Sequence, residues 1–368
     1  MNPLRLPVIV YAIGWAAVFS GCGQRLVAPV PNPLPDSVIN LPMSGNFILC
    51  YEKAVGGYWN VFISGVNPVN VSLATGVPYN QDDEYPQWSP DGKCILYRRS
   101  ASIFGPSAHA YDVGNRTDVN LTSDGGVTLL PPQWTPDGRI YCAYQQPVGN
   151  PTCTYLMNVN GTDKKKILDF AADIYFYQDS YSFVYRDGSR WYKTNCDNTV
   201  NQIVLDTLPS QNQFITVRDF NPATGDFLVN TNSIPGDSSD IATYNAATRQ
   251  LTRILKADYG YTVALQRYSP DHTKVVFIEL GSADQYLSVI DNGAKRRLVH
   301  LPKTVPAVTF SYWPMQFSPD GKYVAFSEQV FGTGQWINWV EQLYVVDITT
   351  RGLQHIGEGF APSWNPKP

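Results

Sequence analysis

The sequence predicts an all-β fold built from repeated units, and three observations support this prediction. Aromatic residues make up 13% of the 368 residues, and Gly and Pro number 28 each, a composition typical of short strands joined by tight turns. One short motif, an aromatic residue followed by Ser/Thr-Pro-Asp, recurs along the chain. Its copies are almost evenly spaced, as in the blades of a β-propeller.

The motif has four full and two shortened copies. The full copies are Trp88-Ser89-Pro90-Asp91-Gly92, Trp134-Thr135-Pro136-Asp137-Gly138, Tyr268-Ser269-Pro270-Asp271-His272 and Phe317-Ser318-Pro319-Asp320-Gly321, and the shortened ones are Phe220-Asn221-Pro222 and Trp364-Asn365-Pro366. Successive prolines lie 46, 86, 48, 49 and 47 residues apart. The double interval predicts one copy without the proline near residues 177–185. A period of about 47 residues with strand-like content indicates propeller blades.

Each unit predicts four strands in a fixed order. The aromatic residue ends an inner strand, and Pro, Asp and Gly form the tight turn that follows it. A second strand, a third strand and a short outer strand then complete the blade. The second strands are predicted to begin near residues 46, 93, 139, 182, 226, 273 and 322, which gives seven blades. Six blades are the alternative if residues 173–205 form an insertion, but that segment has the length of one period.

The two ends of the repeat region predict how the ring closes. In the N-terminal blade, the second strand near residues 46–51 has no motif before it. At the other end, residues 362–366 supply an inner strand with no second strand after it. We therefore expect the C-terminal strand to complete the N-terminal blade, which leaves no exposed sheet edge at that point.

The motif and the apolar strand after it resemble the TolB-like propeller repeat over about residues 43–366. The resemblance implies a propeller fold for residues 43–368. It does not imply one function, because such repeats serve periplasmic scaffolds, accessory domains of peptidases and some lyases.

The N-terminal segment reads as a signal peptide over residues 1–21. Arg5 precedes an apolar run of 13 residues at positions 8–20, a length typical of a signal-peptide core and too short for a stable membrane span. Phe19-Ser20-Gly21-Cys22 resembles the bacterial lipobox, which implies cleavage before Cys22 and lipidation of its thiol. An ordinary secretory signal with a chance cysteine is the alternative.

A proline-rich stretch follows Cys22. Residues 22–42 contain five prolines and no apolar periodicity, which favours an extended tether. We expect the propeller to be extracytoplasmic and lipid-anchored to a bacterial membrane. Gly23 stands where enteric lipoproteins retained in the inner membrane carry Asp, so the outer membrane or cell surface is favoured.

Charge and cysteine content narrow the possible partners and cross-links. The net charge of −4, with 16% charged residues, argues against a nucleic-acid partner. Cys142 and Cys153 flank a short hairpin loop and are expected to lie opposite each other, which makes them the disulfide candidate. Cys50 and Cys94 are expected to be buried hydrophobes, and Cys196 has no assigned role.

Catalytic signals are weak. The sequence contains no Gly-x-Ser-x-Gly and no glycine-rich nucleotide motif, so we predict no catalytic residues and no cofactor. By repeat phase none of the four histidines falls on an inner strand. Asp82, Asp83 and Glu84 form a weak calcium candidate, with a solvated acidic loop as the alternative.

Aromatic residues on predicted loops are the strongest sign of binding. The longest loop, residues 329–341, carries Phe331, Trp336 and Trp339, and Tyr312 and Trp313 are expected nearby on the same face. Exposed rings on long loops suit a protein hot spot or sugar stacking; the alternative is that they pack the loop down.

Together these features predict a membrane-anchored binding or scaffold module for an envelope protein, peptide or glycan. The second hypothesis is a carbohydrate-active lyase or hydrolase with its site in the channel. A purely structural part of an envelope complex is the third.

Overall fold

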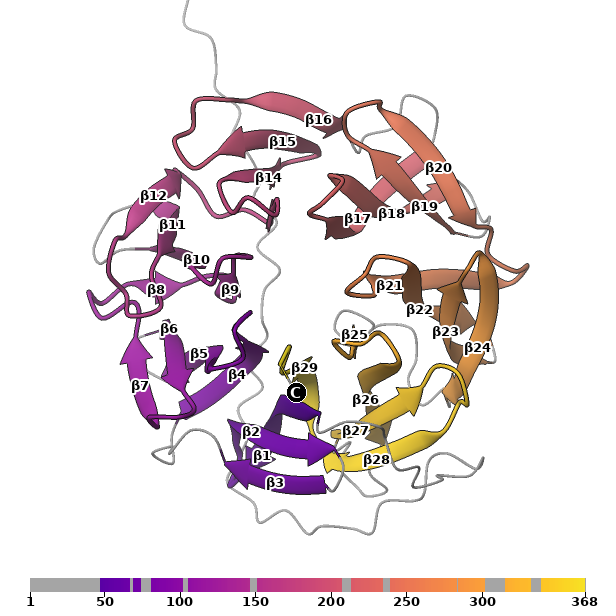
Figure 1. The fold of residues 1–368 in the computed structure, drawn as a ribbon, viewed down its shortest axis with the longest axis horizontal. Helices are drawn as coiled ribbons and strands as arrows, with labels where there is room; N and C mark the ends of the chain where they lie inside the picture. Colours follow the sequence, from indigo (N-terminus) through magenta and orange to yellow (C-terminus); the bar gives the residue numbers. More distant parts are fainter. Residues whose placement is uncertain are drawn as a thin grey trace, which may run out of the picture. The chain divides into compact units, whose positions relative to one another are not determined.

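We describe a computed structural model of the chain in residues 47–66, 69–73, 81–101, 105–145, 151–206, 213–233, 239–282, 284–301, 315–331 and 339–367. These residues contain 29 strands in seven sheets, arranged as blades around a ring (Figure 1). The chain is a seven-bladed β-propeller. The prediction of seven blades is confirmed, and the six-blade alternative is wrong, because residues 173–205 form a complete four-stranded blade. The predicted signal peptide and tether lie outside the described residues.

Blades 1 to 3 each run from the inner strand to the outer strand. Blade 1 consists of β29 (Phe360–Trp364), β1 (Ile48–Val55), β2 (Tyr58–Val66) and β3 (Val69–Leu73). Blade 2 consists of β4 (Gln81–Trp88), β5 (Cys94–Ala101), β6 (Gly105–Asp112) and β7 (Thr117–Asn120). Blade 3 consists of β8 (Val127–Thr128) and β9 (Gln133–Trp134) on the inside, then β10 (Ile140–Gln145), β11 (Thr152–Met157) and β12 (Lys165–Leu168).

Blades 4 to 7 follow the same order. Blade 4 consists of β13 (Ile174–Phe176), β14 (Ser182–Asp187), β15 (Arg190–Asn195) and β16 (Gln202–Asp206). Blade 5 consists of β17 (Gln213–Asn221), β18 (Asp226–Ser233), β19 (Asp240–Asn245) and β20 (Gln250–Leu255). Blade 6 consists of β21 (Tyr261–Tyr268), β22 (Lys274–Gly281), β23 (Gln285–Asp291) and β24 (Ala294–Leu301), and blade 7 of β25 (Met315–Phe317), β26 (Tyr323–Phe331), β27 (Trp339–Asp347) and β28 (Leu353–Glu358).

The Ser/Thr-Pro-Asp motif forms the turn between the inner and second strands. In each full copy the hydroxyl donates to the carboxylate two residues later, as in Ser89 to Asp91 (2.6 Å) and Ser318 to Asp320 (2.6 Å). The fifth residue has positive φ, for example +67° at Gly321, a conformation that favours glycine. His272 occupies this position in blade 6 with φ of +58°. The turn chemistry therefore fixes where each second strand begins.

The ring closes as the sequence predicts. β29 pairs with β1, with Leu49 opposite Trp364 and Cys50 opposite Ser363. Trp364 is only 3% exposed, and its indole N–H donates to the carbonyl of Gln316 at 2.9 Å. The last strand of the chain thus joins blade 7 to blade 1.

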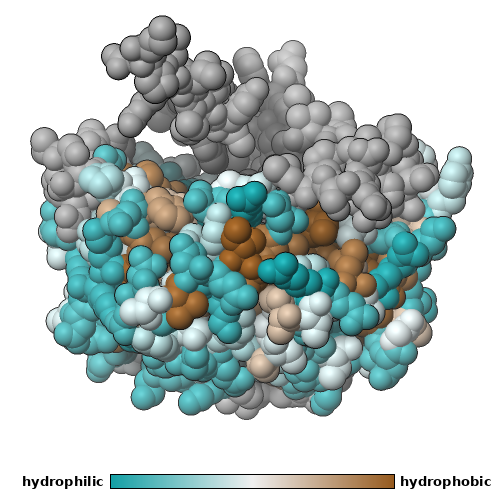
Figure 2. Space-filling model, turned by 90° about the horizontal axis from the view of Figure 1, so that it is seen from above, coloured by the Kyte–Doolittle hydropathy of each residue, from teal (hydrophilic) through white to brown (hydrophobic). Residues whose placement is uncertain are grey.

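The hydrophobic core lies between neighbouring blades. Each of the seven apolar clusters in the described residues draws its members from two consecutive blades. Tyr97, Phe183, Phe227, Phe277 and Phe326 on the second strands are almost completely buried. On the side of the molecule seen in Figure 2, hydrophilic residues predominate, and hydrophobic ones form small separate patches. The described part of the chain contains no apolar helix of the length needed to cross a membrane.

Blades 3 and 4 have shortened inner strands. Pro131 and Pro132 separate β8 from β9, because proline has no N–H to donate to a sheet ladder. In the next blade β13 has only three residues. Two incomplete inner strands therefore lie side by side, and the space beside them forms the candidate site.

Candidate functional site: a cavity between blades 3 and 6

One inner-strand position, the residue before the strand's final aromatic, recurs in all seven blades. Its occupants pair at the same register with the second strands, and they are Gln87, Gln133, Tyr175, Asp219, Arg267, Gln316 and Ser363. Three of them accept a hydrogen bond from the backbone N–H of the aromatic in the next blade: Ser363 from Trp88 (3.2 Å), Asp219 from Tyr268 (2.9 Å) and Gln316 from Trp364 (2.9 Å). These contacts tie neighbouring blades together on the inside of the ring.

Around the shortened strands the same position opens onto a cavity of about 500 Å³, a volume within the usual range of ligand sites. Four of the seven occupants line the wall of this cavity: Gln133, Tyr175, Asp219 and Arg267. The other lining side chains with polar or aromatic character are Tyr141, Asp173, Arg186, Trp191 and Thr216. The cavity therefore combines aromatic, cationic, anionic and neutral polar groups.

The aromatic part of the wall is pre-packed. The ring of Tyr175 stacks on Trp191 at 5.6 Å and on Phe220 at 5.7 Å, with interplanar angles of 27° in both cases. Burial raises the pKa of Tyr175 to about 12, so its hydroxyl stays protonated at neutral pH. The Tyr141 hydroxyl donates to the carbonyl of Ile174 at 2.8 Å. These rings give the cavity a packed, rigid wall.

Two arginines lie together at the inner strands of blades 5 and 6. Arg218 is the extra residue of a β-bulge in β17, where the register shifts between Val217 and Asp219; bulges of this kind re-aim side chains. Arg267 donates from Nη1 to the backbone carbonyl of Arg218. Burial and the neighbouring charge of Arg267 lower the pKa of Arg218.

The positive charge of this pair is uncompensated in the described structure. Within the described ranges neither Arg218 nor Arg267 forms an ion pair, and the buried Nε of Arg218 has no hydrogen-bond partner. The nearby carboxylate of Asp219 instead accepts hydrogen bonds from the backbone N–H groups of Phe220 and Tyr268, both at 2.9 Å. A buried unpaired polar group is costly. Arg267 lines the cavity and Arg218 lies next to it, so this side of the cavity is suited to an anion.

The three acids of the weak calcium candidate do not converge. Asp82, Asp83 and Glu84 lie within β4, not in a loop, so consecutive side chains point to opposite faces of the sheet. Each has a separate partner: Asp82 accepts from the N–H of Trp59 (2.8 Å), Asp83 pairs with Arg99 (2.7 Å), and Glu84 pairs with Arg98 (2.6 Å). Among the described residues no group of three acidic, His or Cys side chains converges on a metal position.

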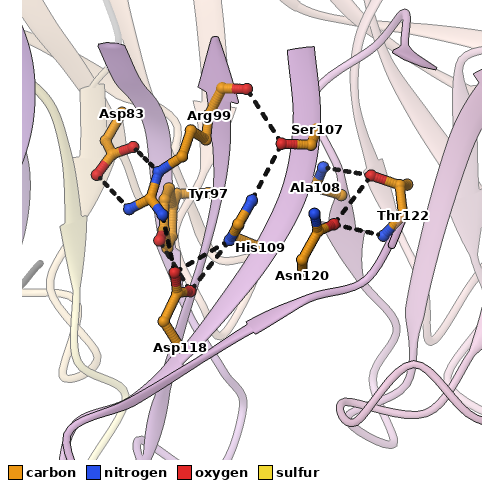
Figure 3. A network of polar contacts seen from close by, with 9 residues as sticks. All are labelled: Asp83, Tyr97, Arg99, Ser107, Ala108, His109, Asp118, Asn120 and Thr122. Carbon is orange, nitrogen blue, oxygen red and sulfur yellow. Dashed lines mark hydrogen bonds and ion pairs between the residues drawn. The ribbon is translucent and has the colours of Figure 1, made fainter. Parts of the chain in front are cut away.

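Asp83 belongs to a buried polar network in blade 2 that the sequence analysis missed (Figure 3). Arg99 bridges Asp83 and Asp118, and Asp118 also accepts from the Tyr97 hydroxyl (2.9 Å) and lies 3.1 Å from Nδ1 of His109. Although burial raises it, the contacts of His109 and Arg99 hold the pKa of Asp118 below its ordinary value.

Ser107 also belongs to this network, because its Oγ lies 3.0 Å from Nε2 of His109. Ser107, His109 and Asp118 are therefore connected in the same order as the triad of a serine hydrolase. The surroundings favour a structural role. His109 is 6% exposed, and Asp118 is shared with Tyr97 and Arg99 rather than reserved for the imidazole. We interpret the network as a polar clamp that joins β4, β5, β6 and β7.

The predicted disulfide is wrong at the level of strand register. In the β10–β11 hairpin Cys142 pairs with Tyr155, and Cys153 pairs with Tyr144, so the two cysteines are offset by two residues. Both thiols are free, and the Cys142 thiol lies near the Thr128 hydroxyl instead. Cys50 is fully buried, as expected, and Cys94 is partly buried.

The histidines lie where the repeat phase places them. His109 is on β6, His272 in the turn after β21, His300 on β24 and His355 on β28. None is on an inner strand.

Of the predicted aromatic binding residues, only two have a described backbone. Phe331 ends β26 and pairs with Trp339, the first residue of β27. Trp336, Tyr312 and Trp313 lie outside the described residues. The ends of β26 and β14 are equivalent in their blades, so Phe331 and the cavity residue Arg186 lie on the same face of the ring.

Comparisons with known proteins identify the fold and no family. No family model and no curated protein matches the sequence. TolB from Acinetobacter baumannii shares 17% identity at a TM-score of 0.50, covering 88% of this chain and 68% of that one. An oligogalacturonate lyase from Vibrio parahaemolyticus shares 11% identity at a TM-score of 0.56, covering 84% of each chain.

A puromycin-hydrolysing peptidase from Mycobacterium tuberculosis is a third structural neighbour, with 14% identity and a TM-score of 0.57 over 91% of this chain. The match covers 57% of the peptidase. These identities are low, and the neighbours differ in activity, so the likeness extends to the TolB-like propeller fold alone.

Proposed function

We propose that this protein is a lipid-anchored, extracytoplasmic binding module that holds an envelope partner in the cavity between blades 3 and 6. The sequence supports the anchor through the apolar run at residues 8–20 and the lipobox-like segment ending in Cys22. The observation that carries the binding role is the cavity itself. It is lined by Arg267, which forms no ion pair in the described structure, and by rigid aromatic side chains.

Pre-formed polar and aromatic walls are typical of binding sites, because little conformational entropy is lost when a ligand enters. The inner strands of the four blades provide this rigidity, and the shortened strands β9 and β13 provide the room. A site built in this way needs no chemistry of its own. The predicted aromatic loop around Trp336 extends the proposal to a second contact on the same partner.

A cavity-filling substitution tests this function. Thr216 lines the cavity and is exposed, so Thr216→Trp places a large ring in the cavity while leaving the core intact. Its matched control is Thr252→Trp, at an exposed position on β20 of the same blade. The full-length proteins would be purified from envelope extract after mild cross-linking, and the partners identified by mass spectrometry.

We expect wild type and Thr252→Trp to retain a common partner that Thr216→Trp loses, with all three proteins melting at similar temperatures. If Thr216→Trp recovers the same partner in the same yield, the cavity is not the binding site. If all three proteins recover none, the binding role itself is contradicted.

A further inference from the structure

We infer that the ligand of this cavity is an acidic peptide segment whose carboxylate is bound by Arg218 and Arg267. The inference rests on the proposed binding function and specifies its partner chemistry. It depends on two features of the cavity: where its charges are left unpaired, and which faces of its aromatic rings are accessible.

The charge argument begins with the arginine pair. Two guanidinium groups on neighbouring inner strands repel each other, and the described structure supplies no counter-ion to either. Asp219 follows Arg218 in the sequence, but its carboxylate already accepts hydrogen bonds from two backbone N–H groups. An incoming anion would meet the exposed side chain of Arg267 and, next to it, the guanidinium of the half-buried Arg218, whose Nε itself is enclosed. Planar guanidinium groups bind carboxylates in a two-pronged geometry.

The rest of the wall selects a weakly charged anion. Asp173 and Asp219 also line the cavity. Asp173 pairs with Arg186, another lining residue, at 3.7 Å, so it is the charge of Asp219 that opposes a doubly charged phosphate more strongly than a single carboxylate. The chain as a whole carries a net charge of −4. Binding of an acidic segment would therefore depend on the local arginines and not on the overall field of the protein.

The aromatic rings favour a peptide over a glycan. Sugar recognition uses an open ring face on which a pyranose can stack. The ring of Tyr175 packs against the protein rings of Trp191 and Phe220, and Trp191 is 3% exposed. The cavity wall also offers two groups suited to peptide bonds, the exposed Thr216 and the amide of Gln133.

The test uses the detergent-solubilised full-length protein and a phage-displayed library of random linear heptapeptides as the probe. Selected peptides would be synthesised, and their Kd values measured by fluorescence anisotropy. We expect a shared Asp or Glu in the selected peptides. Replacing that acid with its amide should weaken binding at least tenfold. Arg267→Gln and Arg218→Gln should each do the same.

Double-mutant cycles then connect the peptide acid to the arginines. Against Arg267→Gln, the difference in affinity between the acid and amide peptides should be much smaller than against wild type, because the carboxylate has lost one of its two partners. Arg253→Gln is the control, since Arg253 is exposed on β20 and pairs with Asp240 at 2.8 Å; its binding should match wild type. Arg267 is exposed, so Arg267→Gln should fold normally. It can therefore still test the inference if Arg218→Gln unfolds.

Two results would overturn the inference while leaving the proposed function intact. One is the selection of peptides without an acid, or of acidic peptides whose affinity Arg267→Gln does not change. The other is an arginine-dependent affinity for trigalacturonate, added as a competitor, that exceeds the affinity for every selected peptide. Failure of the proposed function would differ, because the envelope partner would then bind Thr216→Trp as well as wild type.

Discussion

At the scale of single residues, a buried carboxyl group on β1 makes folding sensitive to pH. Glu52 is 5% exposed and accepts a hydrogen bond from the N–H of Tyr85. Burial raises its pKa from 4.5 to about 8. Between these two values the folded protein holds a proton that the unfolded chain releases, so the free energy of unfolding falls as pH rises, at up to about 1.4 kcal/mol per pH unit.

Glu52→Gln tests this linkage, because the amide resembles the protonated acid and keeps an acceptor for Tyr85. We expect the variant to melt at a higher temperature than wild type at pH 8 and at a similar temperature at pH 5. Thermal unfolding followed by circular dichroism across pH 5–8 measures the difference. Glu328, whose pKa burial also raises to about 8, should leave a residual slope in the single variant. A lower melting temperature for Glu52→Gln at pH 8 would contradict the argument.

The residue scale is also where the sequence misled most. Three adjacent acids form only a weak calcium candidate, and two cysteines beside a loop form the disulfide candidate; neither set of side chains converges in the structure. Strand alternation separates Asp83 from Asp82 and Glu84, and hairpin register offsets Cys142 from Cys153. The pairing register of two strands depends on where each strand begins and ends. The amino-acid composition of the loop between them does not determine those positions.

At the scale of elements, the turn motif made the second strands predictable to within about two residues. The hydroxyl, carboxylate and left-handed residue close the same turn in each full copy. The inner strands of blades 3 and 4 were less predictable, since Pro131 and Pro132 interrupt one and the proline motif is missing from the other. Those two departures from the repeat mark the cavity, and they were its only sequence signal.

His272 provides a test of this turn. It adopts φ of +58° where the other full copies carry glycine, and a left-handed conformation costs a residue with a side chain roughly 1–2 kcal/mol. We expect His272→Gly to stabilise the protein by about 1 kcal/mol, reduced by the loss of the ring contact with Tyr268 at 5.3 Å. Chemical denaturation measures the change.

The matched reverse change is Gly321→Ala in blade 7. A Cβ there would approach other atoms no closer than 3.9 Å, so strain at φ of +67° is the only expected cost. It should destabilise the protein by about 1 kcal/mol. If both substitutions leave the denaturation midpoint unchanged, this turn does not control blade stability.

At the scale of the whole molecule, the fold depends on ring closure by β29. Deleting residues 360–368 removes a strand ladder and the buried ring of Trp364, which contacts Phe47 at 5.5 Å. Loss of a buried Trp alone costs roughly 3–5 kcal/mol, out of a typical 5–15 kcal/mol. We expect the truncated protein to lose cooperative thermal unfolding. Deletion of residues 367–368 alone keeps β29 and is the control; equal melting curves for both deletions would show that closure contributes little.

The position of the whole molecule in the cell depends, in our proposal, on Cys22. A propeller that recruits an envelope partner gains effective concentration when it is held at the membrane, and a lipid on this thiol would provide that attachment. We expect Cys22→Ser to abolish lipidation, so that the protein appears in the soluble fraction or stays in the membrane with its signal peptide uncleaved.

Intact mass spectrometry after membrane fractionation separates these outcomes. Wild type should show the mass of a chain cleaved before Cys22 plus lipid, and Cys22→Ser should not. Cys196→Ser, which changes a buried free thiol, is the control and should fractionate as wild type does. A Cys22→Ser protein that is cleaved and still membrane-bound would show that the attachment lies elsewhere in the chain.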